Sequence, residues 1–550
     1  MNAETFFKHF ATFAEAIDGI ERIKTLIYEL AFTGRLGADS DGVDNVELTS
    51  GWIERDVGEV VEFARPGFAC SKTHQVIDGH VHLRTHNIST ESRLNFDLMI
   101  RIDRSMVDPN RASLRKGDIL FNNTNSQELV GKTCLVDQDY DYGFSNHLTQ
   151  IRLLDGFEPD FFVRQINLLW RRGDFAKQCN RWIGQAGINT KALMAMRLRF
   201  PPLAEQKRIV AKLDRLLGLC DELESRQAAR REARMRLVGA TLDRLVSTSS
   251  TAEFPKHVNR VRDQFDRLFD TLTTIPQLRQ TILQLAVQGK LVPQDPNDEP
   301  AESIFKRVGE DRRNNIKQNT AEATERLEAV KEDEEPFQLP PSWRWVRLGD
   351  VASIKHGFAF SSNSFSNEPT KFVLTTPGNF HETGGFRDRG QKTKYYDGPV
   401  PPGFVLKSGD LIVPMTEQAA GLLGSPAFVP NDGKSYLHNQ RLGKLSFYSE
   451  SIAPEFVFWF FNCEFFRDEL ARNCTGMKVR HTSPKKILKV PFPLCSLTEQ
   501  RRIVEKVEQM MSFCDDLETK LTESETLSTQ LLSAAVHHLL NASSTKQLGK

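Results

Sequence analysis

The sequence lacks the features that mark secreted, membrane-spanning and zinc-stabilised proteins. Its eight cysteines are scattered and none forms a Cys-x-x-Cys pair, so we expect no structural zinc site. No apolar run reaches the roughly 18 residues that a membrane helix needs. The first 30 residues carry several carboxylates, unlike a signal peptide. We therefore expect a soluble cytoplasmic protein of a reducing compartment, without membrane contact.

Catalytic and nucleotide-binding motifs are also missing. The sequence has no GxxxxGK[ST] phosphate loop, no GxGxxG, no GxSxG and no HExxH. It has no [NDS]PP[YF] tetrapeptide of the kind that amino-methyltransferases use, and the polar run at 122–125 lacks the prolines. These absences indicate a non-catalytic protein that binds and assembles, with no cofactor or metal of its own.

Length and charge set wide bounds on the organisation. A chain of 550 residues is long enough for two to four domains, each with its own core. Charged residues make up 26% of the sequence and the formal net charge is zero, so no overall field points to a nucleic acid. A neutral total still permits local basic faces.

The chain does contain a long internal repeat. Residues 203–225 recur as residues 497–519 at a constant offset of 294. The shared residues of the first copy are Leu203, Glu205, Gln206, Arg208, Ile209, Val210, Cys220, Asp221, Leu223 and Glu224. A repeat period near half the chain predicts two copies of one domain-sized unit.

Both copies of this repeat have the pattern of long helices. Apolar residues follow the alternating spacing of three and four that is typical of a coiled-coil seam. That seam is Ile209, Leu213, Leu216, Cys220 and Leu223 in the first copy, and Ile503, Val507, Met510, Cys514, Leu517 and Leu521 in the second. Prolines precede each copy, and each helix could run about 40 residues or roughly 60 Å. We expect the two helices to pair with each other; the alternative is one amphipathic helix packed on each domain's own core.

Other segments repeat around these helices. Residues 3–36 match 258–291 at an offset of 255, so each unit should open with a helical pair. Gly117-Asp118-Ile119 and Gly409-Asp410-Leu411 each predict a turn into a strand. Segments beginning at Pro159 and Pro454 each predict a buried aromatic helix. The sequences between these elements mostly differ, as expected for variable loops on a shared frame.

The second unit is 36 residues longer than the first between Leu291 and Trp343. The inserted sequence is polar and charged. Residues 301–333 have only a thin apolar stripe, which predicts a solvated helix, and the remainder is expected to be linker. We expect this insert to be a surface segment that the fold tolerates; the alternative is a functional role of its own.

The variable loops have the polar and basic side chains that nucleic-acid recognition uses. Arginine and lysine suit phosphates and guanine edges, and asparagine and glutamine can bond adenine. Each side chain alone also fits a solvated surface, so the set is more persuasive than its members. The candidates for DNA binding are Asn122, Asn123, Asn125, Gln127, Lys132, Arg181, Asn189 and Lys191 in the first region, and Arg387, Arg389, Lys392, Lys394, Gln418, Arg441, Lys478, Arg480, His481 and Lys485 in the second.

The first long helix carries a row of arginines whose role the sequence leaves open. They could face DNA backbone or a partner, or form a solvated face paired with Glu222 and Glu232. The residues are Arg226, Arg230, Arg231, Arg234 and Arg236.

These motifs resemble one known family. The segments PPLAEQKRIVAKLD and LTEQRRIVEKVE resemble those of the specificity subunit of bacterial type I restriction–modification systems. The helix endings LAFTGRL and LAVQGKL, followed by a start such as Trp343 to Val351, belong to the same pattern. The first copy departs from it, because DVGEV stands where LGDV is expected. The resemblance covers essentially the whole chain, although the loops carry no diagnostic motif.

The resemblance implies an α+β protein with two similar α/β target-recognition domains, separated by two long antiparallel helices in a pseudo-twofold repeat. Each domain would be similar to the DNA-recognition domain of adenine methyltransferases. The implied segments are an N-terminal helical region (1–50), recognition domain 1 (51–202), long helix 1 (203–250), a central helical region and charged linker (251–342), recognition domain 2 (343–496) and long helix 2 (497–550).

The resemblance also implies a function. Each recognition domain would read half of a split, asymmetric site in double-stranded DNA, and the helices would set the spacer between the half-sites. Two modification subunits would supply S-adenosylmethionine-dependent adenine methylation, and restriction–translocase subunits would use ATP and Mg²⁺. The competing classes are a coiled-coil protein adaptor without DNA recognition and an enzyme with an unrecognised site.

Overall fold

The structure of the chain is a computed structural model that describes residues 6, 8–36, 51–182, 185–250, 252–317, 327–474 and 480–541. They form two compact units: unit 1 holds residues 1–230 and 524–550, and unit 2 holds residues 231–523. Two helices of 45 residues each, α8 (Leu203–Ser247) and α17 (Leu497–Asn541), belong partly to each unit. Both begin where the repeated sequence begins.

Unit 1 has a bundle in which α3 packs against both long helices. Lys24 of α3 pairs with Asp221, and Phe32 at the end of α3 lies in the same core as Leu213, so α3 and α8 run in opposite directions. The helices of this bundle are α2 (Phe10–Glu15), α3 (Gly19–Phe32), the first part of α8 and the last part of α17.

The contacts of α3 with α17 fix the direction of the second long helix in unit 1. Arg22 donates to the carbonyl of Thr529 at 3.5 Å and Arg35 donates to that of Leu540 at 3.2 Å. Helix α3 therefore runs parallel to α17. Because α3 is antiparallel to α8, the two long helices are antiparallel to each other in this unit.

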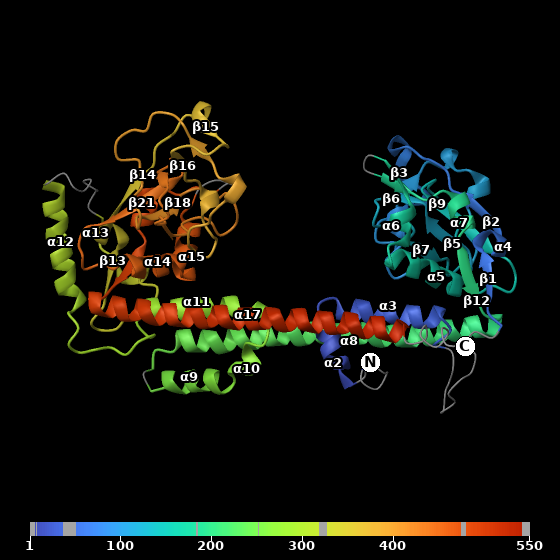
Figure 1. Cartoon of the computed structure of the whole chain (residues 1–550), viewed down its shortest axis with the longest axis horizontal. Coiled ribbons are helices and arrows are strands. Elements are labelled where there is room, and N and C mark those ends of the chain that lie inside the picture. Colours follow the sequence, from blue (N-terminus) through green and yellow to red (C-terminus); the bar gives the residue numbers. More distant parts are fainter. Residues whose placement is uncertain are drawn as a thin grey trace. The chain divides into compact units, whose positions relative to one another are not determined.

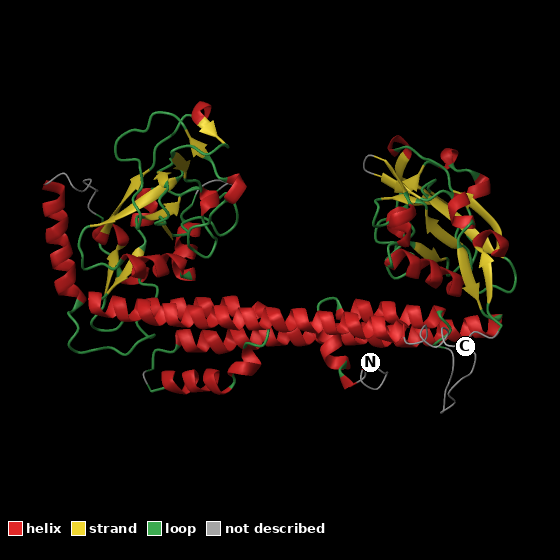
Figure 2. Ribbon diagram, viewed as in Figure 1, coloured by secondary structure: helices red, strands yellow, loops and turns green. Residues whose placement is uncertain are grey.

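Unit 2 repeats this bundle with the roles of the long helices exchanged (Figures 1 and 2). Helix α11 is antiparallel to α17, because Arg279 pairs with Asp515 while Gln294, beyond the end of α11, contacts Glu499. The helices of this bundle are α9 (Phe254–Asp263), α10 (Phe265–Leu268), α11 (Ile275–Val287), the last part of α8 and the first part of α17.

Domain 1, residues 53–200 of unit 1, is built on an antiparallel sheet in the order β2-β9-β5-β7. A second sheet, β4-β3-β8, contains a parallel pair, β3 and β8. The strands are β1 (Ile53–Asp56), β2 (Val61–Pro66), β3 (Gln75–Leu83), β4 (Arg101–Ile102), β5 (Ile119–Asn122), β6 (Thr124–Asn125), β7 (Thr133–Leu135), β8 (Gly143–Phe144), β9 (Leu148–Leu153), β10 (Asn180–Trp182), β11 (Gln185–Gly187) and β12 (Arg197–Phe200). Its helices are α4 (Val57–Val60), α5 (Pro159–Arg171), α6 (Asp174–Gln178) and α7 (Thr190–Met194).

Domain 2, residues 344–494 of unit 2, has the same plan. Its sheet β14-β21-β18-β19 corresponds to β2-β9-β5-β7, and its parallel pair β16 and β20 corresponds to β3 and β8. The strands are β13 (Arg344–Arg347), β14 (Ala352–His356), β15 (Phe365–Ser366), β16 (Phe372–Leu374), β17 (Tyr395–Tyr396), β18 (Leu411–Pro414), β19 (Ala427–Phe428), β20 (Ser435–Leu437), β21 (Leu442–Phe447) and β22 (Pro491–Leu494). Its helices are α13 (Leu348–Val351), α14 (Pro454–Asn462), α15 (Glu464–Arg472) and α16 (Pro484–Leu488).

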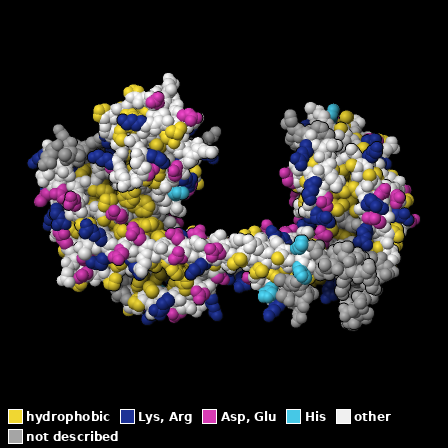
Figure 3. Space-filling model, viewed as in Figure 1, with side chains coloured by type: hydrophobic (Ala, Val, Ile, Leu, Met, Phe, Trp, Pro, Cys, Tyr) yellow, Lys and Arg dark blue, Asp and Glu magenta, His cyan; other side chains and the backbone are white. Residues whose placement is uncertain are grey.

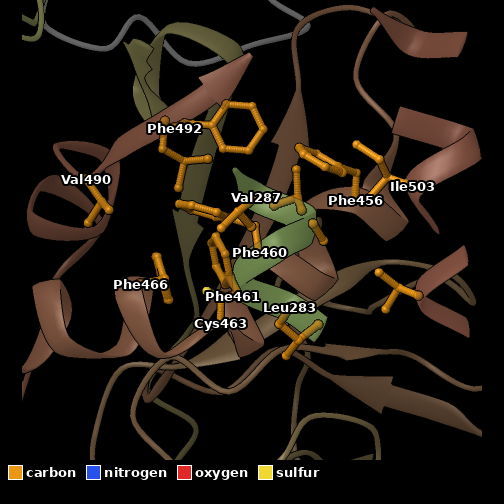
Figure 4. Packing of buried hydrophobic residues seen from close by; sticks show 14 of the residues in the cluster. Leu283, Val287, Phe456, Phe460, Phe461, Cys463, Phe466, Val490, Phe492 and Ile503 are labelled. Atoms are coloured by element: carbon orange, nitrogen blue, oxygen red, sulfur yellow. The ribbon is translucent and has the colours of Figure 1, made fainter. Parts of the chain in front are cut away.

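The predicted α+β fold, with two similar domains and two long antiparallel helices, is confirmed. The predicted strands after Gly117 and Gly409 are β5 and β18, and both glycines have positive φ. The predicted aromatic helices are α5 and α14, each with proline in its first turn. Figure 4 shows the core of unit 2, where side chains from α11, α14, β22 and α17 converge: Leu283, Val287, Phe456, Phe460, Phe461, Phe492 and Ile503.

The repeated glutamine of the long helices joins each helix to its domain. Gln206 is buried, accepts the backbone N–H of Glu158 at 2.8 Å and donates to the carbonyl of Pro201 at 2.8 Å. Gln500 does the same with Ala453 at 2.8 Å and Cys495 at 2.9 Å. Glu158 and Ala453 are the N-cap residues of α5 and α14. Each glutamine therefore satisfies backbone groups that a helix start leaves unpaired.

The repeated acidic pair of the long helices has an equally specific structural role. In unit 1, Asp221 and Glu224 contact Lys24 of α3 at 2.9 and 3.2 Å. In unit 2, their counterparts Asp515 and Glu518 contact Arg279 of α11 at 2.5 and 2.9 Å. The seam residues beside them pack mainly on the short helices and the domains, because Ile209 and Leu213 lie in the core of domain 1. The two long helices share a cluster in unit 1, where Cys220 of the first seam lies with Leu532 and Ala535 of α17, which are outside the second seam.

The insert of the second unit does not form the predicted solvated helix. Helix α12 (Ala301–Lys317) buries one face completely, since Ala301, Ile304 and Val308 are at most 1% exposed in the core of unit 2. Residues 327–331 are not helical, and residues 318–326 lie outside the described part. Three apolar residues at helical spacing were enough for packing because unit 2 supplies an apolar surface that the local sequence does not reveal.

Candidate nucleic-acid interface

Two separate polar segments of domain 1 meet in one small sheet. Strand β6, which follows β5, pairs with β11, and β11 pairs with β10 in the order β10-β11-β6. This brings the predicted residue Asn125 opposite Ala186, close to Arg181 on the adjacent strand. Figure 1 shows β3 and β6 at the end of domain 1 that is farthest from α8. We call residues 123–127, 180–182 and 185–191 the strand-loop surface of domain 1.

Most predicted residues of this surface are exposed or half-buried. Gln127 and Arg181 both donate to the carbonyl of Ala176, at 3.1 and 3.5 Å. Asn189 caps α7 through the backbone N–H of Ala192 at 2.7 Å. Asn123 is half-buried and donates to the carbonyl of Asn146 and the hydroxyl of Thr149. Asn125 is also half-buried, and the exposed residues are Arg181, Asn189 and Lys191.

Two predicted residues are placed differently. Asn122 is fully buried and donates to the carbonyl of Leu129 at 3.1 Å. Lys132 is 7% exposed and donates to the carbonyl of Ile88 at 2.6 Å, and burial lowers the pKa of its ammonium group. Both side chains hold loops together from inside, so they cannot reach DNA in this conformation. The sequence places both beside exposed polar residues, and only the fold shows that their side chains point inward.

Domain 2 brings together the corresponding loop pair. Thr416, which follows β18, forms an isolated β-bridge with His481. The guanidinium group of Arg480 donates hydrogen bonds to both carboxylate oxygens of Glu417. Arg480 is 44% exposed at its side chain, and Gln418 and Arg441 are exposed. His481 contacts Thr416 at 3.3 Å, and Lys485 is exposed on α16. Lys478 lies outside the described residues.

The remaining predicted residues of domain 2 surround β17. Lys392 and Lys394 are exposed, and Lys394 donates to Asn367 at 2.6 Å. Arg387 pairs with Glu382 at 2.7 Å, and Arg389 reaches Thr376 at 3.5 Å. These four residues and those near Arg480 lie on two different loop sets of the same domain. Glu382, the partner of Arg387, lines one pocket together with Glu417 and Arg480, so the two loop sets are neighbours.

Sequence reasoning missed the matching basic surface in domain 1. Strand β4 corresponds to β17, because Gln75 pairs with Ile102 just as Phe365 pairs with Tyr396. Around β4 the side chains of Lys72, His74, Arg101 and Arg104 are all exposed. We call residues 72–83 with 101–104 the motif hairpin of domain 1, and residues 362–366 with 394–397 that of domain 2.

A short repeated motif could have revealed these hairpins. Gly67-Phe68-Ala69-x-Ser71 recurs as Gly357-Phe358-Ala359-x-Ser361 at an offset of 290. A Cβ atom on Gly67 would lie 2.0 Å from the carbonyl oxygen of Phe144, and one on Gly357 would lie 1.9 Å from that of Asn439. Only glycine permits this close approach of two backbones. The same backbone contact therefore positions the hairpin that follows in both domains.

The arginines of α8 are mainly engaged within the chain. Arg226 pairs with Glu222 at 2.6 Å and Arg236 with Glu232 at 3.5 Å, as the solvated-face alternative expects. Arg234 reaches Asp270 at 2.7 Å within unit 2. Figure 3 shows Lys and Arg interspersed with Asp and Glu on the visible face of each domain. Recognition would therefore depend on individual loops, since no surface of one charge dominates that face.

Among the residues that the structure describes, no group of three or more His, Cys, Asp or Glu side chains is arranged to hold a metal ion. In the same described ranges, no helix is both long and apolar enough to cross a bilayer.

The chain is similar to several known proteins. Residues 50–230 and 340–524, well over half of the chain, match the family model described as type I restriction modification DNA specificity domain. The type I restriction enzyme EcoAI specificity subunit of Escherichia coli is 29% identical over 345 residues, and the EcoEI specificity subunit of the same organism is 29% identical over 347 residues. Each match covers 62% of this chain and 58% of the relative, less than two thirds of its length.

A solved structure shares the fold. It concerns complex assembly and conformational transition of the type I restriction–modification system, and its matching chain is 19% identical, with a TM-score of 0.51. The match covers 89% of this chain and 97% of that chain. The family model includes both domains and the first part of the long helix that follows each, so this chain belongs to the type I restriction–modification DNA specificity domain family.

Proposed function

We propose that this chain is a sequence-specific DNA-binding subunit that reads a bipartite, asymmetric target, with one half-site for each domain. The observation that carries the proposal is the duplication itself. Two copies of one scaffold present different side chains at corresponding loops, such as Asn125 with Gln127 in domain 1 and Gln418 with Arg480 in domain 2. A symmetric frame with unlike loops suits an asymmetric sequence.

The chemistry of the loops supports base and phosphate contacts. Amide side chains such as Gln127 can accept from and donate to adenine, and arginines such as Arg480 suit guanine or phosphate. Lys394 on the motif hairpin of domain 2, Lys392 just before it, and Lys72 and Arg104 on the motif hairpin of domain 1 are exposed cations that suit phosphate. The DNA-binding set we propose is the predicted one without the buried Asn122 and Lys132, together with Lys72, His74, Arg101 and Arg104.

We further propose that the chain binds two copies of a modification subunit through equivalent exposed apolar residues. Leu219 of α8 is 54% exposed in unit 1, and its repeat partner Phe513 of α17 is 52% exposed in unit 2. Leu237 and Leu531, also related by the repeat, are 59% and 53% exposed. Unit 1 also has an apolar groove of about 530 Å³ beside Leu219. Large apolar side chains kept exposed at matching positions favour one kind of partner bound twice.

In this function the chain itself is non-catalytic. The modification subunits would bind S-adenosylmethionine and methylate adenine, and restriction–translocase subunits would use ATP and Mg²⁺. The specificity chain would contribute only the choice of site and the spacing of its halves.

A domain exchange tests the proposal. The wild-type chain with its modification subunit should select particular duplexes from a random-sequence pool, with retention that falls steeply as salt rises. Replacing residues 343–494 by the corresponding domain of another family member should change one half-site and leave the other unchanged. Selection of no sequence at any salt concentration would identify a protein adaptor instead, and a change in both half-sites would refute the modular reading. Turnover by the purified chain alone would identify an enzyme.

A further inference from the structure

We propose that Ile77, at the tip of the motif hairpin of domain 1, inserts as an apolar wedge between base pairs of the target DNA. This inference rests on the proposed function and specifies one contact within it. Ile77 is 99% exposed, which is the largest exposure given for any large apolar side chain in the described residues. A single exposed isoleucine is common on protein surfaces. The inference therefore rests on where Ile77 lies in the hairpin and on the residues around it.

A bulge in the strand makes Ile77 project. Gln75 and His80 both pair with Ile102, so the residues between them have no partner on β4 and loop outward. The loop is held at its base, because Arg101 donates to the carbonyl of Gly79 at 3.0 Å. A Cβ atom on Gly79 would lie 2.2 Å from the carbonyl oxygen of Ile102, so this tight return requires glycine. These contacts fix the base of the bulge, so Ile77 projects from a defined position.

Basic side chains lie on the segments at the base of the bulge. Lys72 and His74 lie on the 3₁₀ turn (Lys72–His74) that leads into the strand, and the backbone carbonyl of His74 accepts the N–H of Asp103 at 3.0 Å, beside Arg104. Lys72 and Arg104 pair with no carboxylate in the described part of the chain. Asp78 is the only acidic neighbour within the bulge, and Asp103 already accepts two bonds from Ser105. An apolar tip that projects from a hairpin with basic side chains suited to phosphate matches side chains that enter a base step and unstack it.

Domain 2 also exposes an apolar residue on its motif hairpin, at the position that corresponds to Gln75 rather than to Ile77. Phe365 follows the 3₁₀ turn (Ser362–Ser364) of the second motif hairpin and is 42% exposed. Its neighbour across the hairpin is Tyr396, and Lys394 lies on the same strand region. The two hairpins differ in sequence after the shared glycine motif, and each exposes an apolar side chain at its own position.

The test uses the full chain with its modification subunit and duplexes selected by the wild-type protein from a random pool. 2-Aminopurine is placed in turn at each step of the half-site that domain 1 reads, since its fluorescence rises when it unstacks. Wild type should brighten one step. Ile77→Ala should bind about tenfold more weakly, equal to about 1.4 kcal/mol, and should leave that step dark. Ile77→Leu should restore both effects, because leucine can also fill a base step.

Two further variants separate the wedge from other effects. Leu154→Ala removes an apolar side chain of domain 1 that is 43% exposed outside the hairpin, and it should bind like wild type. Ile77→Lys should bind non-target DNA more tightly without brightening, because it adds a cation and removes the wedge. Full affinity and full brightening with Ile77→Ala would overturn the wedge and leave DNA recognition intact. Loss of modification-subunit binding with unchanged DNA affinity would also overturn it. Failure of wild type to select any sequence would instead refute the proposed function.

Discussion

Replacing Gln500 by alanine should loosen domain 2 from its long helix. Gln500 is 0% exposed and makes three hydrogen bonds to backbone groups: it accepts from Ala453 at 2.8 Å and donates to Ser451 at 3.1 Å and Cys495 at 2.9 Å. Alanine leaves these three groups buried without a partner. Each neutral bond contributes about 1 kcal/mol, so the local opening free energy should fall by about 3 kcal/mol.

Hydrogen exchange read by mass spectrometry measures this loss locally, which matters because a protein of several domains does not unfold in one step. Exchange in the peptide that contains Ala453 and the first turn of α14 should become roughly a hundredfold faster. Gln206→Ala should do the same to the start of α5 and leave α14 unchanged. Gln509→Ala, at an exposed position of α17, is the matched control. Acceleration of less than about threefold in α14 would show that the repeated glutamine is not the structural anchor that we infer.

Three further predictions follow from the same contacts. His82 and His438 are buried, and burial lowers the pKa of each imidazole from 6.5 to about 4. Between these two pH values only the unfolded chain binds a proton at each histidine. Each domain should therefore lose up to about 3 kcal/mol of stability as the pH falls from 6.5 to 4. Urea unfolding of His438→Gln should show a flatter pH dependence in domain 2, and an unchanged dependence would contradict this assignment. Arg279→Met should cost about 1 kcal/mol, because its carboxylate partners are largely exposed, and a cost that did not shrink in 1 M salt would rule out an ionic contact. Phe513→Ser should leave the fold intact and release one of two modification subunits, measured by native mass spectrometry; retention of both would remove this residue from the docking surface.

The sequence predicted the frame well because the frame depends on local patterns. The apolar spacing within each segment's own sequence predicts helices α8 and α17 without knowledge of any tertiary contact. The repeat of Gln206 as Gln500 indicated duplication before any contact was known. The structure then showed why this residue recurs. Each copy accepts the N-cap backbone N–H of an aromatic helix, α5 or α14, in the domain that precedes it. Pattern alone could not give that reason.

The insert and the loops show where such patterns fail. Helix α12 has too thin an apolar stripe to predict burial, yet unit 2 encloses it. Lys132 reads as a surface cation, but its ammonium group bonds the carbonyl of Ile88, a residue 44 positions away. The basic residues around β4 share no sequence pattern with those around β17, and their correspondence rests on the strand pairing and on the repeated glycine motif that precedes each hairpin.

The sequence by itself determined that this protein is a duplicated helical frame with two unlike sets of loops, because helix periodicity and repeated residues are properties of the chain alone. Only the tertiary structure decided which polar side chains remain available to a ligand. Burial depends on which distant segments close over a residue, as Ile88 closes over Lys132, and on where a bulge turns a side chain outward, as at Ile77. Those choices are made by packing between segments, which no local pattern records.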